Sequence, residues 1–155
     1  MKKEVRIGTI LISKPFMEDK RFEKTIILIV ENNIDGVVGF IMNKNISNKI
    51  DALFKLFPNS NFNTKYGGPI DDDNRLFFTH KHPHIINGSK EIKNGLFWGG
   101  ELKDLERGLK SGEIHQNEIN FYLGYTGWDQ DQLNNEIEEG SWILHQMDLE
   151  DLNIN

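Results

Sequence analysis

The stretch that decides the fold is TIILIVENNIDGVVGFIMN, residues 25–43. Residues 25–31 form a β-branched run with the composition of a strand, and a second apolar run covers 36–43. The residues between them, 32–36, have the composition of a hairpin loop. We therefore predict two antiparallel strands here, preceded by a further strand over residues 5–13.

Around this hairpin, the periodicity of apolar residues predicts three helices and several short strands. Residues 47–57 carry apolar side chains at helical spacing and end at Pro58. Leucines recur at helical spacing over 102–109, before Gly112, which suits a left-handed helix end. Further strands are predicted at 63–66, at 76–79, on both sides of the Asn94-Gly95 turn, at 118–125 and at 142–144. Because hairpins join many of these strands, we predict one mixed α/β domain of the α+β type over residues 1–155, with mostly antiparallel pairing.

The segment LGYTGWDQDQLNNEI, residues 123–137, has the pattern of a helix start that follows a strand. Asp129 stands at the N-cap position and Gln132 follows three residues later, which is the spacing of a capping box. Trp128 and Leu133 lie on either side of this cap, at the spacing of a hydrophobic staple. We predict the third helix from this pattern.

A glycine-rich anion loop is the functional alternative for the same segment. A phosphate cradle needs free backbone amides at a helix start, whereas Asp129 and Asp131 place negative charge there. We favour the structural interpretation. It leaves Tyr122, Tyr125 or Trp128 free to line a cleft.

The overall charge argues against a nucleic-acid-binding domain. Twenty-four acidic and eighteen basic residues give a formal charge of −6, which repels phosphate backbones at long range. The absence of cysteine excludes disulfides, thiolate ligands and cysteine nucleophiles. No stretch approaches the roughly 20 apolar residues of a membrane-spanning helix. We expect a cytoplasmic protein with no membrane partner.

Three alternating histidines, His80, His82 and His84, are the best metal candidate in the sequence. Alternate positions on a strand share a face, so three imidazoles could bind zinc or nickel there. Pro83 disrupts regular strand geometry, however. We therefore favour one histidine at a strand end, followed by a polar loop, and we predict no metal ligand.

The acidic run DDDN, residues 71–74, could bind a hard cation. It lacks the glycine and the terminal glutamate of a calcium loop, so we interpret it as an acidic turn. As an alternative function, Asp71 or Asp73 would join the three histidines in a metal-assisted hydrolase.

Basic residues concentrate in the N-terminal quarter: Lys2, Lys3, Arg6, Lys14, Lys20, Arg21 and Lys24. They offer a second alternative function, direct DNA binding. No recognition helix rich in Arg, Asn or Gln accompanies them, and solvated strand flanks explain them equally well. We therefore disfavour direct nucleic-acid binding.

Motifs for covalent catalysis are absent from the sequence. It contains no G-x-S-x-G elbow, no S-x-x-K and no P-loop, so we predict neither a catalytic residue nor a cofactor. Gly67-Gly68-Pro69 combines two flexible residues with one of fixed φ, which directs the backbone sharply and could expose amides to a ligand. Such a loop more often only turns a strand.

Three stretches resemble the bacterial YqgE/AlgH family in order and spacing: residues 8–44, YGGPIDDDNRLFFTH at 66–80, and LGYTGWDQDQLNNEIEEGSWIL at 123–144. The resemblance implies a bent sheet that closes into a pseudo-barrel, flanked by about three helices. Members often carry the label of transcriptional regulators, but the family brings no established enzyme activity, cofactor or catalytic residue. This chain departs from the family at Glu31-Asn32, where members commonly have Glu-His. Members usually continue past residues 142–144 into a C-terminal segment with a further helix, and we expect the given sequence to be a short or trimmed version of that pattern.

From the three motifs together we expect a non-enzymatic cytoplasmic binding or regulatory module, acting through an unknown protein partner or a small ligand. The sequence leaves the oligomeric state open. The residues expected where the motifs converge are Asn43, Lys44, Gly67, Gly68, Pro69, His80, Tyr125 and Trp128.

Overall fold

The computed structural model describes residues 4–15, 19–46, 51–58, 60–70 and 75–146. The strands are β1 Ile10–Ser13, β2 Ile26–Asn33, β3 Gly36–Ile41, β4 Asn63–Tyr66, β5 Leu76–His80, β6 Lys90–Lys93, β7 Leu96–Trp98, β8 Asn120–Leu123, β9 Thr126–Trp128 and β10 Trp142–His145. The helices are α1 Asp51–Leu56, α2 Leu102–Ser111 and α3 Gln130–Glu138, with short 3-10 turns at Lys20–Phe22 and Gln116–Glu118. Among the residues described, no helix has the length and apolar composition needed to cross a bilayer.

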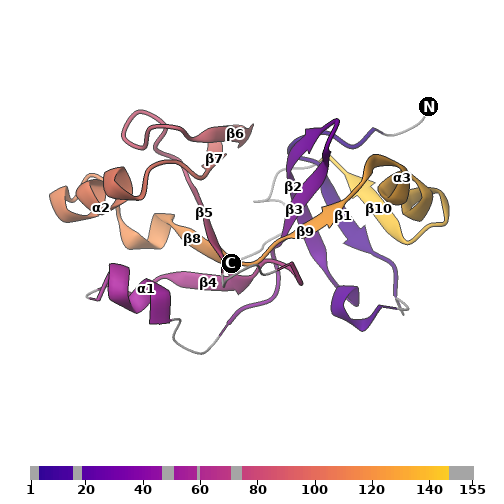
Figure 1. The fold of residues 1–155 in the computed structure, drawn as a ribbon, viewed down its shortest axis with the longest axis horizontal. Coiled ribbons are helices and arrows are strands. Elements are labelled where there is room, and N and C mark those ends of the chain that lie inside the picture. Colours follow the sequence, from indigo (N-terminus) through magenta and orange to yellow (C-terminus); the bar gives the residue numbers. More distant parts are fainter. Residues whose placement is uncertain (1–3, 16–18, 47–50, 59, 71–74, 147–155) are drawn as a thin grey trace.

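The strands form two five-stranded sheets that lie side by side (Figure 1). The first sheet has the order β10-β1-β2-β3-β9, and all its pairs are antiparallel. The second has the order β4-β8-β5-β7-β6, and only the pair β4–β8 is parallel. The prediction of a mixed α/β fold with mostly antiparallel pairing is therefore confirmed.

The predicted hairpin at residues 25–43 is confirmed as β2–β3. Its register runs from Ile27 opposite Ile41 to Asn33 opposite Gly36, with one bulge near Glu31. The strands extend further into the predicted loop than the loop composition suggested. The strand expected over 5–13 is shorter than predicted, because Gly8 has a φ of +96° and the regular pairing starts only at Ile10.

Turns and helix ends lie where short sequence patterns predict them. Asn94 and Gly95 both have positive φ, as the hairpin turn between β6 and β7 requires. The N-cap of α3 is Asp129, whose Oδ1 accepts a hydrogen bond of 2.7 Å from the Gln132 N–H. Gly112 ends α2 in the left-handed conformation. The first predicted helix is present as α1, and its expected beginning at residues 47–50 falls outside the described residues.

Three hydrophobic clusters arrange the elements in layers. One cluster lies on the α3 side of the first sheet and contains Ile29, Trp142 and Leu133. A second lies between the second sheet and the helices α1 and α2, around Phe121 and Leu105. The third joins the facing sides of the two sheets. Figure 1 accordingly shows α3 with the first sheet and α1 and α2 with the second.

Aromatic rings fill much of the layer between the two sheets. Phe40 of β3 stacks on Tyr122 of β8, with ring centroids 4.9 Å apart and planes inclined by 10°. Phe40 also contacts Phe77 of β5 at 5.3 Å and the edge of Trp98 of β7 at 5.7 Å. These offset and edge-on contacts are the favourable geometries for aromatic pairs, so Phe40 connects the two sheets.

The predicted closure into a pseudo-barrel is not confirmed. The described strands form two sheets instead of one. Between them the backbone makes a short irregular ladder, in which the Ile41 N–H donates to the Gly67 carbonyl and the Tyr66 N–H to that of Lys44, both at 2.8 Å. The regular strand pairing of the second sheet ends at this point, because β4 ends just before Gly67 and β8 ends just before Gly124.

These two glycine segments cross in direct backbone contact. The Gly67 N–H donates to the Leu123 carbonyl at 2.7 Å, and Ile70 and Tyr125 exchange two backbone hydrogen bonds of 3.0 and 2.9 Å. A Cβ on Gly67 would collide with the Gly124 carbonyl oxygen, and a Cβ on Gly124 would collide with the carbonyl oxygen of Gly68. We call this contact between residues 67–70 and 123–125 the glycine crossing.

We predict that Gly124→Ala destabilises the protein far more than Gly112→Ala. Both glycines have left-handed φ values, +74° and +82°, but only Gly124 has backbone atoms in the space of a Cβ. The left-handed conformation alone should cost the Gly112 variant about 1–2 kcal/mol. The collision should add about 1–3 kcal/mol for the Gly124 variant, because the obstacle is backbone and not a flexible side chain.

Urea unfolding followed by far-UV circular dichroism measures both free energies of unfolding. Equal losses in the two variants would show that the glycine crossing can relax around a methyl group.

Candidate functional site

The glycine crossing brings together Gly67, Gly68, Pro69 and Tyr125, four of the eight predicted site residues. Both glycines are buried, and the Gly67 N–H is already bonded to a carbonyl. Tyr125 is half-buried and packs edge-on against Phe77, with ring centroids 5.7 Å apart. The motif thus serves to join the two sheets, and the Gly67 amide is not available to cradle an anion.

Asn43 and Lys44 lie beside the crossing and fix the loop that precedes β2. The Asn43 side chain accepts from the Ile26 N–H at 3.0 Å and donates to the Lys24 carbonyl at 2.9 Å. Lys44 Nζ donates to the Arg21 carbonyl at 2.6 Å. Partial burial lowers the pKa of Lys44, while nearby carboxylates oppose that shift. Both side chains hold backbone groups in place.

His80 lies at the end of β5, completely shielded from solvent at 0% exposure. Its Nδ1 accepts from the His82 N–H and its Nε2 lies 3.0 Å from the Gly99 carbonyl oxygen, so Nε2 must carry the proton of a neutral ring. Desolvation lowers the pKa of His80. Because both ring nitrogens are engaged, His80 has no lone pair left for a metal.

The other two histidines separate from His80. The Nε2 of His82 lies 3.0 Å from Oε2 of Glu118, and His84 is exposed. Within the described ranges, no group of three or more His, Cys, Asp or Glu side chains is placed to hold a metal ion. The preferred interpretation, one histidine at a strand end followed by a polar loop, is confirmed. Asp71 and Asp73, proposed as helpers, lie outside the described residues.

Trp128 lies on the α3 side of the first sheet, in the same buried cluster as its predicted staple partner Leu133. Its indole N–H points to Oε1 of Glu136 at 3.4 Å, and the indole of Trp142 donates to the same oxygen at 3.0 Å. The two indoles meet edge to face at 6.0 Å. Glu136 thus anchors α3 to β9 and β10, a role that the sequence pattern did not reveal.

Lys65 of β4 was also missed, because polar residues flank it and no apolar alternation marks it as buried. It is 2% exposed, and its Nζ donates to the Met42 carbonyl at 2.8 Å. Burial lowers the pKa of this lysine. Its register partner Tyr122 has a buried hydroxyl with no hydrogen-bond partner among the described residues, and burial raises the pKa of Tyr122 to about 12. The neighbouring Thr79 side chain opposes that rise.

Acidic neighbours partly neutralise the basic N-terminal quarter. Arg21 makes a two-pronged ion pair with Asp19, with the closest atoms 2.7 Å apart. Lys20 lies 3.7 Å from Glu23. Lys2 and Lys3 fall outside the described residues. The geometry therefore weakens the hypothesis of a basic DNA-binding face.

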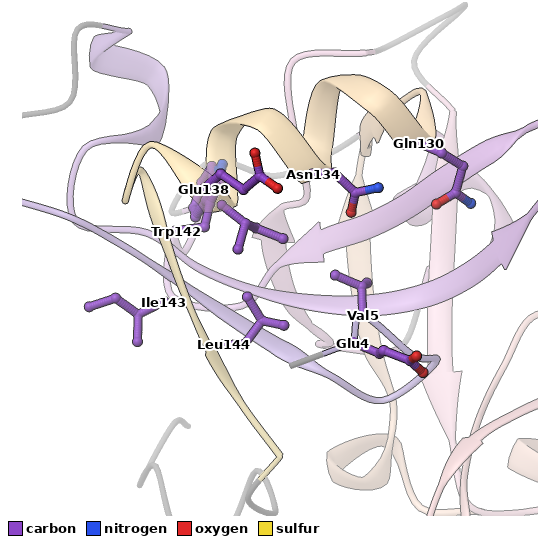
Figure 2. A pocket seen from close by; sticks show the side chains of 9 residues that line it. Glu4, Val5, Gln130, Asn134, Glu138, Trp142, Ile143 and Leu144 are labelled. Atoms are coloured by element: carbon purple, nitrogen blue, oxygen red, sulfur yellow. The ribbon is translucent and has the colours of Figure 1, made fainter. Parts of the chain in front are cut away.

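A groove of about 700 Å³ opens between α3, β10 and the N-terminal segment around Glu4 (Figure 2). We call it the α3–β10 groove. Apolar side chains of Val5, Ile137, Trp142 and Leu144 line it. Its polar lining consists of two carboxylates and two amides: Glu4, Glu138, Gln130 and Asn134. None of these residues was a predicted site residue, because the groove forms only when the N-terminal segment meets α3 and β10 near the other end of the described chain.

We predict that His80 makes stability depend on pH. A buried neutral histidine has a lowered folded-state pKa, so the unfolded chain binds the proton more readily. Its contribution to stability is therefore complete above the unfolded pKa of about 6.5 and decreases as the pH falls toward the folded pKa. Between pH 7 and pH 5, His80→Gln should lose less of its free energy of unfolding than the wild type.

The exposed His84 provides the control, since His84→Gln should keep the wild-type slope. Urea titrations at several pH values measure these slopes. A His80→Gln slope as steep as that of the wild type would contradict the assignment of a neutral buried ring.

We predict that Glu136→Ala destabilises the protein by about 1–3 kcal/mol, because it leaves two largely buried indole N–H groups without an acceptor. Glu136→Gln keeps an acceptor oxygen and should retain most of the stability. Urea unfolding followed by tryptophan fluorescence compares the two variants. If both lose the same free energy, the carboxylate charge and not the acceptor atom is responsible.

The sequence of the chain matches a known protein family. A family model described as AlgH-like matches residues 10–153. A UPF0301 protein of Cytophaga hutchinsonii is 34% identical over 145 residues, which cover 94% of this chain and 80% of the relative. A UPF0301 protein of Parabacteroides distasonis is 35% identical over 139 residues, covering 88% and 70%.

Two solved structures resemble the fold of this chain. The solution structure of the AlgH protein from Pseudomonas aeruginosa superposes with a TM-score of 0.70 at 25% identity, covering 96% of this chain and 82% of that chain. A crystal structure of a Corynebacterium diphtheriae protein shares the fold with a TM-score of 0.70 at 18% identity, covering 93% and 77%. The resemblance predicted from the three motifs is thus confirmed, and the chain belongs to the AlgH-like family.

Proposed function

We propose that this chain is a cytoplasmic binding module that acts through a protein partner and not by a reaction of its own. The observation that carries the proposal is the α3–β10 groove, about 700 Å³ in volume and lined by both apolar and polar side chains. Apolar contact area with a few polar groups beside it is what a protein partner needs for specific binding.

The use of polar atoms elsewhere supports a binding role. His80, Asn43 and Lys44 direct their polar atoms to backbone groups of the same chain. A nucleophile or general base has to reach a substrate within hydrogen-bond distance. These three candidates are instead occupied in holding the fold.

The shape of the groove favours a protein partner over a small ligand. Sites for small molecules usually bury about 70–90% of the ligand surface. Here the lining includes Ile143 of β10, which is 50% exposed. A segment of another protein can follow such an open groove. Any effect on transcription would then arise through that partner and not from DNA contacts.

Site-directed photo-crosslinking tests this proposal, because the chain has no cysteine and a single one can be placed at will. Asn134→Cys puts a photoreactive label on an exposed position of the groove, and Lys110→Cys puts the same label on α2. We predict a discrete crosslinked protein in cell extract from position 134 and none from position 110. Unlabelled wild-type chain should compete with the product.

A variant with a bulky side chain in the groove tests whether the groove itself binds the crosslinked protein. Ile137→Trp should weaken the competition, while a surface change on α2, Lys103→Gln, should not. The proposal fails if positions 134 and 110 give the same products, or if neither gives a product that the wild-type chain displaces.

A further inference from the structure

The turn that follows β5 is bonded to the end of that strand by an imidazole nitrogen. Nδ1 of His80 accepts from the His82 N–H at 3.0 Å. The carbonyl of His82 in turn accepts from the N–H groups of Ile85 and Ile86 at 3.2 and 3.0 Å. Residues 82–86 therefore form one hydrogen-bonded turn, which we call the His82 turn, and the lone pair of Nδ1 holds its first residue.

A proton on Nδ1 is incompatible with this bond. A positively charged imidazole has two N–H donors and no acceptor. Nε2 of His80 can continue to donate to the Gly99 carbonyl at 3.0 Å, but the new N–H on Nδ1 would face the N–H of His82. The His82 turn then has to move away, so that water can reach Nδ1.

The surroundings of the His80 ring disfavour a charge in the closed turn. The ring is completely buried and contacts the rings of Phe78 and Phe97, with centroids 5.5 and 6.2 Å away. Burial lowers the pKa of His80, the bond to the Gly99 carbonyl opposes this shift, and His82 adds to it. Among the residues described, no carboxylate bonds to this ring. The proton therefore favours a conformation in which the ring is solvated.

The side chain of His82 has a carboxylate partner on another element. Its Nε2 lies 3.0 Å from Oε2 of Glu118, in the 3-10 turn Gln116–Glu118. The N–H of His115 lowers the pKa of Glu118, desolvation opposes this shift, and the side chains of His82 and His115 lower the pKa further. Glu118 therefore stays ionised in mild acid. A protonated His82 gains a charge-assisted hydrogen bond there, so acid strengthens this contact.

The residue that follows the His82 turn has anchors of its own on α2. The N–H of Asn87 donates to Oδ2 of Asp104 at 3.0 Å, and the Asn87 carbonyl accepts from the Glu101 N–H at 2.9 Å. Asp104 lies 3.5 Å from Arg107, so this carboxylate has a cation beside it. None of these bonds involves His80. Movement of the His82 turn is therefore confined between β5 and Asn87.

We propose that His80 and His82 form a pH-dependent latch in the second sheet. Protonation of the His80 ring releases the His82 turn from the end of β5. The ion pair between His82 and Glu118 keeps the released turn attached to the 3-10 turn Gln116–Glu118. The latch lies outside the α3–β10 groove, so it is a conformational switch beyond the proposed function and does not depend on it.

The latch opens as the pH falls. In the open turn the ring is solvated and has the ordinary histidine pKa of about 6.5, whereas the pKa is lower in the closed turn. The open turn therefore binds the proton more readily, and acid favours opening. The ratio of open to closed turns is constant well above about pH 6.5 and rises up to about tenfold per pH unit between the two pKa values.

Spin labels on the full chain measure the opening. His84→Cys places a label on an exposed position of the His82 turn, and Lys110→Cys places the same label on α2. From pH 7.5 to pH 5 we expect the mobile fraction of the label at 84 to rise at least about threefold, and that at 110 to stay constant. His80→Gln keeps an acceptor for the His82 N–H but does not titrate, so it should abolish the rise at 84.

Three results would overturn the latch: no rise at 84, a rise at 84 that persists in His80→Gln, or equal rises at 84 and 110, which indicate unfolding of the whole domain. Nuclear magnetic resonance of the His80 ring nitrogens in the chain with native His80 keeps the test valid if His80→Gln fails to fold. Its titration midpoint should lie below pH 6.5 and coincide with the rise at 84. A ring that stays neutral while the label at 84 becomes mobile would contradict the proposal.

The contact between His82 and Glu118 has its own matched pair of variants. Glu118→Gln removes the carboxylate charge but keeps an acceptor for the His115 N–H, so the mobile fraction at 84 should rise at least about twofold at pH 5. Glu113→Gln, at an exposed position beyond α2, should leave that fraction unchanged. Equal mobile fractions in the two variants would show that the ion pair does not hold the released turn, which overturns this part of the proposal.

Discussion

The glycine crossing is the constraint on which the rest of the structure depends. Residues 67–70 and 123–125 touch backbone to backbone, and the Cβ positions of Gly67 and Gly124 are filled by carbonyl oxygens. The contact determines where β4 lies beside β8 and where the chain leaves β8 for β9. Because α3 follows β9 directly, the position of the α3–β10 groove depends on the crossing as well.

The glycine crossing gives a structural role to motifs whose sequence resembles that of functional sites. Gly67, Gly68 and Gly124 meet the requirements of a close backbone contact, which only residues without a Cβ can satisfy. His80 also has a structural role. Both nitrogens of its neutral ring are hydrogen-bonded, and they hold the 80–82 turn against Gly99. Residue types that are common in active sites are used here for packing and for backbone hydrogen bonds.

Local rules predicted the parts of the fold that local interactions determine. The β2–β3 hairpin, the Asn94-Gly95 turn and the Asp129 cap each depend on residues within a few positions of one another. The division into two sheets, the burial of Lys65 and the role of Glu136 depend on contacts between distant segments, so no periodicity in the sequence marks them. The groove was missed for the same reason, since its lining comes from both ends of the described chain.

The groove differs from the predicted sites in how its residues are held. Trp142 is fixed by Glu136 from α3, and the neighbouring indole of Trp128 points to the same carboxylate oxygen. Two walls of the groove are therefore a helix and a strand that are tied together by these hydrogen bonds. A surface already formed on rigid elements loses little conformational entropy when a partner binds. This favours specific recognition by the groove, because most of the ordering has already taken place when α3 packs on β10.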